Sequence, residues 1–352
     1  MSETGTPGPV FPGPVFPGPV FIVGASRSGT SLMRTLLNQH GSIHLSIETH
    51  YFDDLRPRMK DPADEELEGA RWHRCENYFL ALSHRLYSQG DPEQGTVSRE
   101  TLRDALPRAR ATADGAFEAF CRVNASREGA TIWGEKTPRH IFRIDDILGR
   151  YPQAKIIAMV RDPRAVVASY RDWRKDLEAE NERTIRSYNI LIATMLWKSG
   201  VIAALTARNA HGPEHIRFVR YEDLVNDPRP VVEGLVEWLG LPFEEALLDV
   251  PVLNSSYQRS SKGGFSKEAI GRWRERLSDR EVALIQQCAG KALTDAGYDA
   301  ADVANMPLHY AWEQIKLPIA ATRAALANRK RIAGLPQYAW RRLRLLMVGT
   351  GN

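Results

Sequence analysis

The residues best suited to chemistry stand in a glycine-bounded loop near the start of the chain. The spacing is Gly24-x-x-x-x-Gly29-Thr30-Ser31, and one basic side chain, Arg27, lies inside the loop. An apolar run comes directly before the loop, and apolar residues at helical spacing follow it. A strand, a tight loop and a helix N-terminus together present a row of backbone N–H groups and the positive end of a helix dipole. The loop is therefore predicted to hold a phosphate-like anion.

This loop differs from that of a P-loop protein that hydrolyses ATP. Such proteins carry Lys directly after the second glycine, where it reaches the transferred phosphoryl group. This chain has Thr30 at that position, and its positive charge comes earlier, at Arg27. The sequence thus predicts an anion site that is not built for hydrolysis of Mg-ATP.

Three more chemically capable side chains stand at the ends of predicted strands. They are Lys136, Arg161 and Tyr221. Ligands of a parallel sheet flanked by helices bind at the carboxyl ends of its strands. We therefore expect these three side chains and Arg27 to lie near one another.

Predicted strands and helices alternate along the chain, which indicates an α/β fold with a central, mainly parallel sheet flanked by helices. The run Lys155–Val160 is apolar after its first residue, as expected of a central strand covered on both faces. Residues 61–130 read as a largely helical insertion, and residues 182–209 read as one long helix. The sheet and its neighbouring helices are the elements that must position the loop and the three strand-end side chains.

Composition and charge exclude several classes of protein. A chain of 352 residues, 43% hydrophobic and 26% charged, is typical of a globular protein, and a net charge of +4 does not indicate a bulk nucleic-acid binder. Three scattered cysteines without a CxxC pair predict neither a disulfide framework nor a zinc site. We see no signal segment and no run long enough to cross a bilayer, so we expect a cytoplasmic protein.

Three regions are expected along the chain. Residues 1–18 form a leader rich in Pro and Gly, and residues 19–310 form the main domain, with a helical insertion at about 55–130. Residues 311–352 form a basic arm.

The arm carries an uneven share of the charge. From Leu317 to Asn352 the sequence has seven basic residues and no acidic one. The mixture of apolar and basic residues over 317–348 suits a helix that lies on an anionic membrane surface, at the inner face of the membrane. Packing on the domain, or a homodimer contact, would suit it equally, so these interpretations stay open.

Four blocks, in this order, resemble the PAPS-dependent sulfotransferases. Those enzymes transfer a sulfuryl group from 3′-phosphoadenosine-5′-phosphosulfate (PAPS) to an acceptor hydroxyl or amine. The resemblance runs from residue 20 to about 300 and implies the P-loop-like sulfotransferase fold. The blocks are Gly24-Ala-Ser-Arg-Ser-Gly-Thr-Ser31, Arg161-Asp-Pro-Arg-Ala-Val-Val-Ala-Ser169, Arg220-Tyr-Glu-Asp-Leu224, and Ser261-Lys-Gly-Gly264 with Ile270-Gly-Arg-Trp273.

The resemblance assigns a role to each block. PAPS carries two separated anions, and the product nucleotide would be 3′-phosphoadenosine-5′-phosphate (PAP). The implied contacts are Arg27, Ser28, Gly29, Thr30 and Ser31 with the 5′-phosphosulfate, Arg161 and Ser169 with the 3′-phosphate, Tyr221 with the adenine or its ribose side, and Lys262 and Gly263 in a loop that closes over the 3′-phosphate. Arg27 and Lys136 are the candidates for stabilising charge on the leaving phosphate, and no metal is expected because cations already hold that phosphate.

The acceptor hydroxyl also needs a base. Glu48, in Ser-Ile-Glu-Thr, resembles the glutamate base of the protein-tyrosine sulfotransferase branch. The rival is His140, because cytosolic sulfotransferases use a histidine shortly after a Lys-Thr pair, and Lys136-Thr137 stands nearby at a different spacing. His50 is a third choice.

Two other functions remain as alternatives. One is a P-loop kinase that uses ATP and Mg²⁺, against which the missing Lys after Gly29 speaks. The other is a non-catalytic protein that binds a nucleotide or a membrane. For a sulfotransferase, the acceptor could be a carbohydrate, a glycolipid, a peptide tyrosine or a small metabolite.

Overall fold

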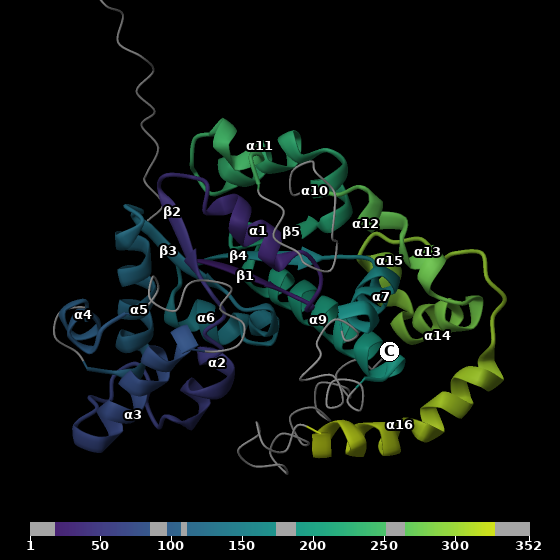
Figure 1. Cartoon of the computed structure of the whole chain (residues 1–352), viewed down its shortest axis with the longest axis horizontal. Coiled ribbons are helices and arrows are strands. Elements are labelled where there is room, and N and C mark those ends of the chain that lie inside the picture. Colours follow the sequence, from purple (N-terminus) through teal and green to yellow (C-terminus); the bar gives the residue numbers. More distant parts are fainter. Residues whose placement is uncertain (1–17, 85–96, 107–110, 174–187, 251–264, 328–352) are drawn as a thin grey trace, which may run out of the picture.

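The fold is a five-stranded parallel sheet with helices on both faces (Figure 1). It is a computed structural model that describes residues 18–84, 97–106, 111–173, 188–250 and 265–327. The strand order is β2-β3-β1-β4-β5, so the strand that precedes the glycine loop is central. The predicted α/β fold is thereby confirmed. The strands are β1 (Val20–Gly24), β2 (Ile43–Ser46), β3 (Ile132–Lys136), β4 (Lys155–Val160) and β5 (Ile216–Arg220).

Fifteen α-helices in the described ranges accompany these strands. They are α1 (Thr30–Leu37), α2 (Tyr51–Asp54), α3 (Gly69–Leu80), α4 (Arg99–Asp104), α5 (Ala113–Arg127), α6 (Ile144–Arg150), α7 (Pro163–Trp173), α9 (Ile190–His211), α10 (Tyr221–Asn226), α11 (Pro228–Trp238), α12 (Glu268–Gly271), α13 (Trp273–Arg276), α14 (Asp279–Ala289), α15 (Lys291–Asp295) and α16 (Pro307–Ala327). A short 3-10 helix, η4 (Pro138–Phe142), follows β3.

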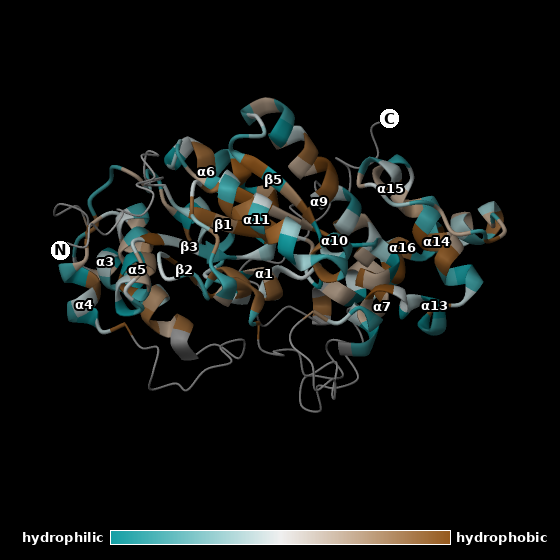
Figure 2. Cartoon of the chain, turned by 90° about the horizontal axis from the view of Figure 1, so that it is seen from above, coloured by the Kyte–Doolittle hydropathy of each residue, from teal (hydrophilic) through white to brown (hydrophobic). Residues whose placement is uncertain are grey.

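The sheet is buried on both faces because successive side chains of each strand point to opposite sides. In β1, Phe21 and Val23 join a core with α5 and α6, whereas Val20 and Ile22 join a core with α1 and α11. All five residues of β1 are buried. Apolar segments accordingly concentrate in the sheet and in the helices beside it (Figure 2). This double burial fixes the strand ends, where the predicted site residues stand.

The predicted helical insertion is present as α3, α4 and α5, at the left of Figure 1. Most of its aromatic residues belong to the core, as expected: Phe79 and Phe117 are fully buried, and Phe117 stacks on Tyr51 with 4.8 Å between ring centroids. The insertion therefore packs against the segment that follows β2, which carries Glu48. The predicted domain boundaries at 18/19 and 310/311 stay predictions.

Helix α9 corrects two expectations. The side chain of Asn189 accepts a hydrogen bond from the backbone N–H of Ile192, so the helix begins at Ile190 and not at residue 182. It is also long and apolar enough to span a membrane by length and composition, which our reading of the sequence missed. However, α9 packs against α14, β5 and α7, and Leu191 and Trp197 are each 1% exposed. We therefore interpret it as a core helix.

The close packing of the sheet predicts a cost for a side chain at Gly134. Gly134 pairs with Val20 between β3 and β1, and a Cβ atom there would overlap the Val20 carbonyl oxygen. Gly134→Ala should lower the free energy of unfolding by about 3 kcal/mol, measured by urea denaturation. Gly149→Ala, in α6 where a Cβ meets nothing within 4 Å, is the control and should be neutral or slightly stabilising. Equal stability of the two variants would contradict this account of the sheet.

Candidate functional site

The glycine loop joins β1 to α1 and has the backbone of an anion cradle. Three of its residues have positive φ, namely Gly24 (153°), Arg27 (72°) and Gly29 (90°). The N-cap residue of α1 is Gly29, and within the described residues no capping side chain accepts from the first N–H groups of the helix, which can therefore bind a ligand. The Ser28 hydroxyl is buried and has no hydrogen-bond partner among the described residues. A buried hydroxyl without a partner is costly, and an oxygen-rich anion would satisfy it.

Arg161, directly after β4, lies against this loop. Its guanidinium donates to the Arg27 carbonyl oxygen at 3.1 Å and to the Ala269 carbonyl oxygen at 3.0 Å, and the residue is 4% exposed. Its Nε is buried and has no acceptor in the described part of the chain. The expected proximity of Arg161 and the glycine loop is therefore present, and the Nε–H of the cation remains for a ligand.

The side chain of Arg27 reaches across to Ser169 of α7. Its Nε donates to the Ser169 hydroxyl oxygen at 3.1 Å. The sequence had assigned Arg27 to one anion and Ser169, with Arg161, to the other. In the structure Ser169 is bound by Arg27, and Arg161 is turned to main-chain carbonyl groups. The two predicted anion sites are thus joined by a direct hydrogen bond.

Tyr221, the first residue of α10, packs between Arg161 and the glycine loop. The Arg161 guanidinium lies 4.2 Å above the ring centroid, and a Cβ atom at Gly29 would come within 2.5 Å of Cδ2 of the ring. Tyr221 is 7% exposed. Its ring therefore supports the loop and Arg161, and its expected contact with adenine stays a prediction.

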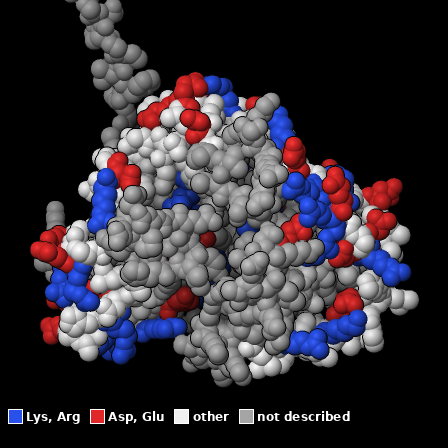
Figure 3. Space-filling model, viewed as in Figure 1, with Lys and Arg blue, Asp and Glu red and all other residues white. Residues whose placement is uncertain are grey.

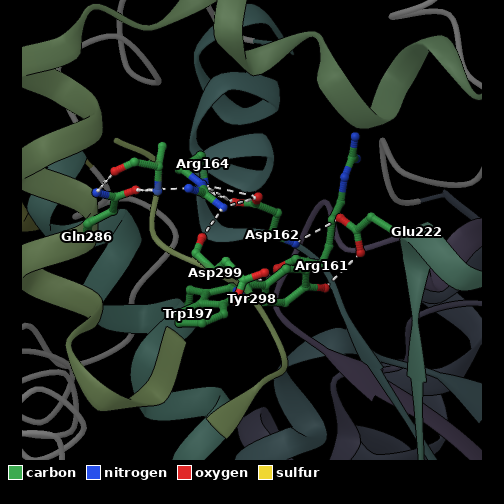
Figure 4. A network of polar contacts seen from close by, with 9 residues as sticks. Arg161, Asp162, Arg164, Trp197, Glu222, Gln286, Tyr298 and Asp299 are labelled. Atoms are coloured by element: carbon green, nitrogen blue, oxygen red, sulfur yellow. Dashed lines mark hydrogen bonds and ion pairs between the residues drawn. The ribbon is translucent and has the colours of Figure 1, made fainter. Parts of the chain in front are cut away.

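A buried polar network holds the ends of β4 and β5 (Figure 4). The Arg164 guanidinium donates hydrogen bonds to both carboxylate oxygens of Asp162 at 2.8–3.1 Å. It also stacks over the Trp273 ring, 4.4 Å from the ring centroid. Glu222 accepts from the backbone N–H of Asp162 at 3.0 Å and from the Tyr298 hydroxyl at 2.7 Å. Asp162 is thereby bound to a neighbouring cation, and Trp273 packs against that cation.

At the end of β3, Lys136 forms an ion pair with Glu48. The Lys136 ammonium lies 2.5 Å from Oε1 of Glu48, and the imidazole Nε2 of His50 lies 3.3 Å from Oε2. Burial alone would raise the pKa of Glu48, but hydrogen bonding by His50 and the charge of Lys136 outweigh it and lower that pKa to about 2. Burial also lowers the pKa of Lys136, against the opposing influence of Glu48. Glu48 is thus a carboxylate held by two partners, with 28% of its side chain exposed.

Comparison with known proteins identifies the family of this chain. A sequence model described as the sulfotransferase family matches residues 19–245. The chain belongs to the sulfotransferase family. Mouse carbohydrate sulfotransferase 1 is 26% identical to this sulfotransferase, with 80% of this chain and 79% of the relative covered. Zebrafish protein-tyrosine sulfotransferase 1 is 25% identical, with 81% and 69% covered.

Solved structures support the fold of this sulfotransferase. The sulfotransferase domain from the curacin biosynthetic pathway aligns with a TM-score of 0.52 at 19% identity, covering 81% of this chain and 99% of that domain. The corresponding domain of the olefin synthase of Synechococcus PCC 7002 aligns with a TM-score of 0.50 at 20% identity, covering 80% and 95%. At such identities the likeness concerns the fold, and it agrees with the fold implied by the four blocks.

Glu48 and His140, two of the three candidate bases, differ in their exposure to solvent. His140 is fully buried, with Nδ1 at 2.5 Å from Oε1 of Glu135 and its ring against Phe52. Glu135 also accepts from the Thr49 backbone N–H at 3.2 Å and from the Thr49 hydroxyl. His140 thus contacts Glu135, which holds Thr49, the residue after Glu48. Glu48 itself is partly exposed. Figure 3 shows one face of the molecule, on which Lys and Arg side chains are interspersed with Asp and Glu side chains.

Sequence reasoning missed some contributors to this site. Glu135, Glu222 and Arg34 were not singled out, although Glu135 directly precedes Lys136 and Glu222 directly follows Tyr221. Burial lowers the pKa of Lys136, and the charge of Arg34 on α1 lowers it further. Burial likewise lowers the pKa of Arg34, against the opposing charge of Glu48, so the three side chains lie near one another. Helical spacing places Arg34 one turn beyond Thr30, which is the signal that could have found it. Lys262 and Gly263 lie outside the described residues.

The pKa of Glu48 predicts how stability depends on pH. The folded pKa of about 2 lies below the ordinary 4.5, so the carboxylate contributes stability above about pH 4.5 and loses it as the pH falls toward 2. Glu48→Gln should therefore lower the free energy of unfolding most near neutral pH, and its difference from the wild type should shrink below about pH 4.5. Urea denaturation across this range measures it. Glu237→Gln, exposed on α11, is the control, and a pH-independent deficit in Glu48→Gln would contradict the ion pair.

Proposed function

We propose that this sulfotransferase uses PAPS as its donor and transfers the sulfuryl group to an acceptor hydroxyl. The observation that carries the proposal is the junction of the two anion-binding blocks: Arg161 donates to the Arg27 carbonyl oxygen, and Arg27 donates to the Ser169 hydroxyl, each at 3.1 Å. A ligand with two separated anions fits this junction. The unpartnered Ser28 hydroxyl, the Arg161 Nε and the uncapped start of α1 are the groups that would receive its oxygens.

In this proposal each block keeps a distinct task. The N–H groups of residues 28–31 and the Arg27 side chain hold the 5′ end of the nucleotide, while Ser169 and the Arg161 Nε serve the 3′-phosphate. Bound PAPS supplies an activated sulfuryl group whose leaving group is a phosphate. Sulfuryl transfer, like phosphoryl transfer, depends mainly on positioning and on stabilisation of charge. Arg27 and Lys136 supply the positive charge for the leaving oxygen.

Glu48 is the proposed base. It accepts the proton of the attacking hydroxyl while the new O–S bond forms, the old S–O bond breaks, and the electron pair stays on the leaving phosphate oxygen. A carboxylate with a pKa of about 2 is a weak base. Movement of Lys136 from Glu48 toward the leaving oxygen would remove one of the two partners that lower that pKa. Lys136 would then couple the arrival of the donor to the strength of the base.

The acceptor is proposed to be a carbohydrate hydroxyl. Two of the similar proteins carry the names carbohydrate sulfotransferase and protein-tyrosine sulfotransferase, and sugars and tyrosine both offer a hydroxyl. In this chain the insertion reaches the base: the Tyr78 hydroxyl of α3 donates to the Thr49 carbonyl oxygen at 2.6 Å. The insertion is thus placed to select the acceptor. A sugar is the first acceptor to test because the match covers 79% of the carbohydrate relative's length, against 69% of the protein-tyrosine relative's length.

The kinase alternative is less well supported. Thr30 stands where the nucleotide-binding Lys of a P-loop kinase would be, and the Asp162 oxygens that could face a metal are bound by Arg164.

Nucleotide binding should discriminate between the two donors. PAP should raise Tm in a thermal-shift assay, and Mg-ATP at the same concentration should not. Gly29→Ala should weaken PAP binding by about tenfold or more, because the residue has φ 90° and its Cβ would press on Tyr221. Gly149→Ala is the matched control and should bind PAP normally. Stabilisation by Mg-ATP equal to that by PAP would favour the kinase.

Glu48→Gln should separate binding from chemistry. With sulfur-labelled PAPS and a pool of carbohydrate acceptors, its kcat should fall by about 10²–10⁴, because a general base contributes that much. Its affinity for PAP should stay at the wild-type value, and Glu237→Gln should keep full activity. A variant that keeps full turnover would exclude Glu48 as the base. A wild-type chain that binds PAP but labels no acceptor, in this pool or in a lysate, would favour the non-catalytic alternative.

A further inference from the structure

Helix α16 (Pro307–Ala327) carries an apolar stripe that the other described residues do not cover. The large hydrophobic side chains that are exposed within the described ranges all lie on this helix: Leu308 (87% exposed), Trp312 (57%), Ile315 (69%), Ile319 (58%) and Leu326 (53%). Their spacings of four, three, four and seven residues place them on one face. From Leu308 to Leu326 the stripe is roughly 27 Å long at 1.5 Å per residue.

The stripe belongs to a helix that is held on the domain. Tyr310 and Leu317, on the opposite face of α16, pack against Leu191 of α9 and against Leu284 and Cys288 of α14. Figure 1 shows α16 along the lower right edge of the molecule, away from the sheet. The apolar stripe therefore points away from a fixed attachment, as a surface for a partner would.

The charges on α16 are arranged beside this stripe. Helical spacing puts Lys316 and Arg323 along one edge of the stripe, and both residues are exposed. The single acidic residue of the helix, Glu313, is paired with Lys316 at 2.7 Å. Lys316 also lies over the Trp312 ring, 5.0 Å from its centroid. The helix thus combines an apolar face, an interfacial Trp and a basic edge.

The sequence after α16 continues the positive charge. Of the seven basic residues between Leu317 and Asn352, all except Arg323 follow residue 327, which leaves six, and no acidic residue lies among them. Cationic residues near an anionic lipid surface are attracted to it.

We propose that α16 docks this sulfotransferase on a membrane surface that contains anionic lipids. The stripe inserts at the level of the headgroups, and Lys316 and Arg323 contact lipid phosphates. This surface begins at Pro307, ahead of the start at Leu317 expected from the sequence, because Leu308, Trp312 and Ile315 belong to the same face. The inference does not depend on the donor or the acceptor of the enzyme.

A second copy of the chain fits the stripe less well. Pro318 interrupts the backbone hydrogen bonding of the helix, and Thr322 breaks the apolar repeat of a coiled-coil seam. Self-pairing would also bring two basic C-terminal segments together, whereas anionic lipids attract them. The charge of this part of the chain therefore favours a lipid surface.

Vesicle co-sedimentation of the full chain tests the proposal. We expect binding to phosphatidylcholine vesicles that contain about 30% phosphatidylserine, weaker binding to pure phosphatidylcholine, and loss of affinity at high salt. Ile315→Glu/Ile319→Glu should reduce binding roughly tenfold or more, because two apolar side chains no longer enter the interface. Thr294→Glu/Gln153→Glu adds the same charge at exposed positions outside α16, and it should bind nearly as the wild type does.

Three measurements keep the result interpretable. The Tm of unfolding and the far-UV circular dichroism spectrum should be the same in both double variants and in the wild type, which shows that the domain is folded. Sedimentation velocity reports the oligomeric state in the absence of lipid. Equal vesicle binding by Ile315→Glu/Ile319→Glu and the wild type would overturn the proposal. A wild-type dimer that this variant dissociates, without vesicle binding, would overturn it in favour of a second copy.

Discussion

The buried guanidinium of Arg161 is the contact on which the rest of the site depends. Its hydrogen bonds join the glycine loop after β1 to the segment that carries α12, and its face rests on Tyr221 at the end of β5. A buried cation is costly unless its donors are satisfied, and here main-chain carbonyl groups satisfy two of them. The cation therefore fixes three segments from distant parts of the sequence. Its Nε has no acceptor among the described residues, so in the function that we propose the same side chain would stabilise the fold and bind an anion.

The carboxylates near the sheet divide into two groups by their partners. Asp162, Glu222 and Glu135 are buried and bound by neighbouring donors, and they position the strand ends and the segment after Glu48. Glu48 is partly exposed, and its partner Lys136 is a cation with a second possible task at the leaving group. The three buried carboxylates stabilise the fold. In the mechanism that we propose, the partly exposed Glu48 exchanges a proton, because only an accessible oxygen can contact an acceptor.

Local patterns predicted the elements, but they could not predict how side chains pair across them. The apolar run of β4 and the glycine spacing are local, and they gave the parallel sheet and the position of the loop. The pairing of Arg27 with Ser169 depends on the left-handed backbone at residue 27, which sends its side chain toward α7. His140 follows Lys-Thr as a catalytic histidine could, and only the tertiary packing on Phe52 and Glu135 shows that it is buried. The membrane-binding segment was expected to begin at Leu317, where the stretch rich in basic residues and free of acidic ones begins. The apolar stripe of α16 begins earlier, at Leu308.

The ion pair of Lys136 with Glu48 suggests how such an enzyme could limit hydrolysis of its sulfuryl donor by water. Water is a competitor for any activated sulfuryl group, and a strong base beside an accessible site would activate water as readily as a sugar hydroxyl. While Lys136 and His50 hold Glu48, its pKa of about 2 makes it a poor base for either nucleophile. In the mechanism that we propose, this restraint is relaxed only when Lys136 turns to the leaving oxygen. By then the acceptor would fill the space beside α3, where Tyr78 binds the residue after Glu48. One cation would thus serve the donor and the base in sequence, which explains why it stands on β3, beside the central strand that precedes the loop.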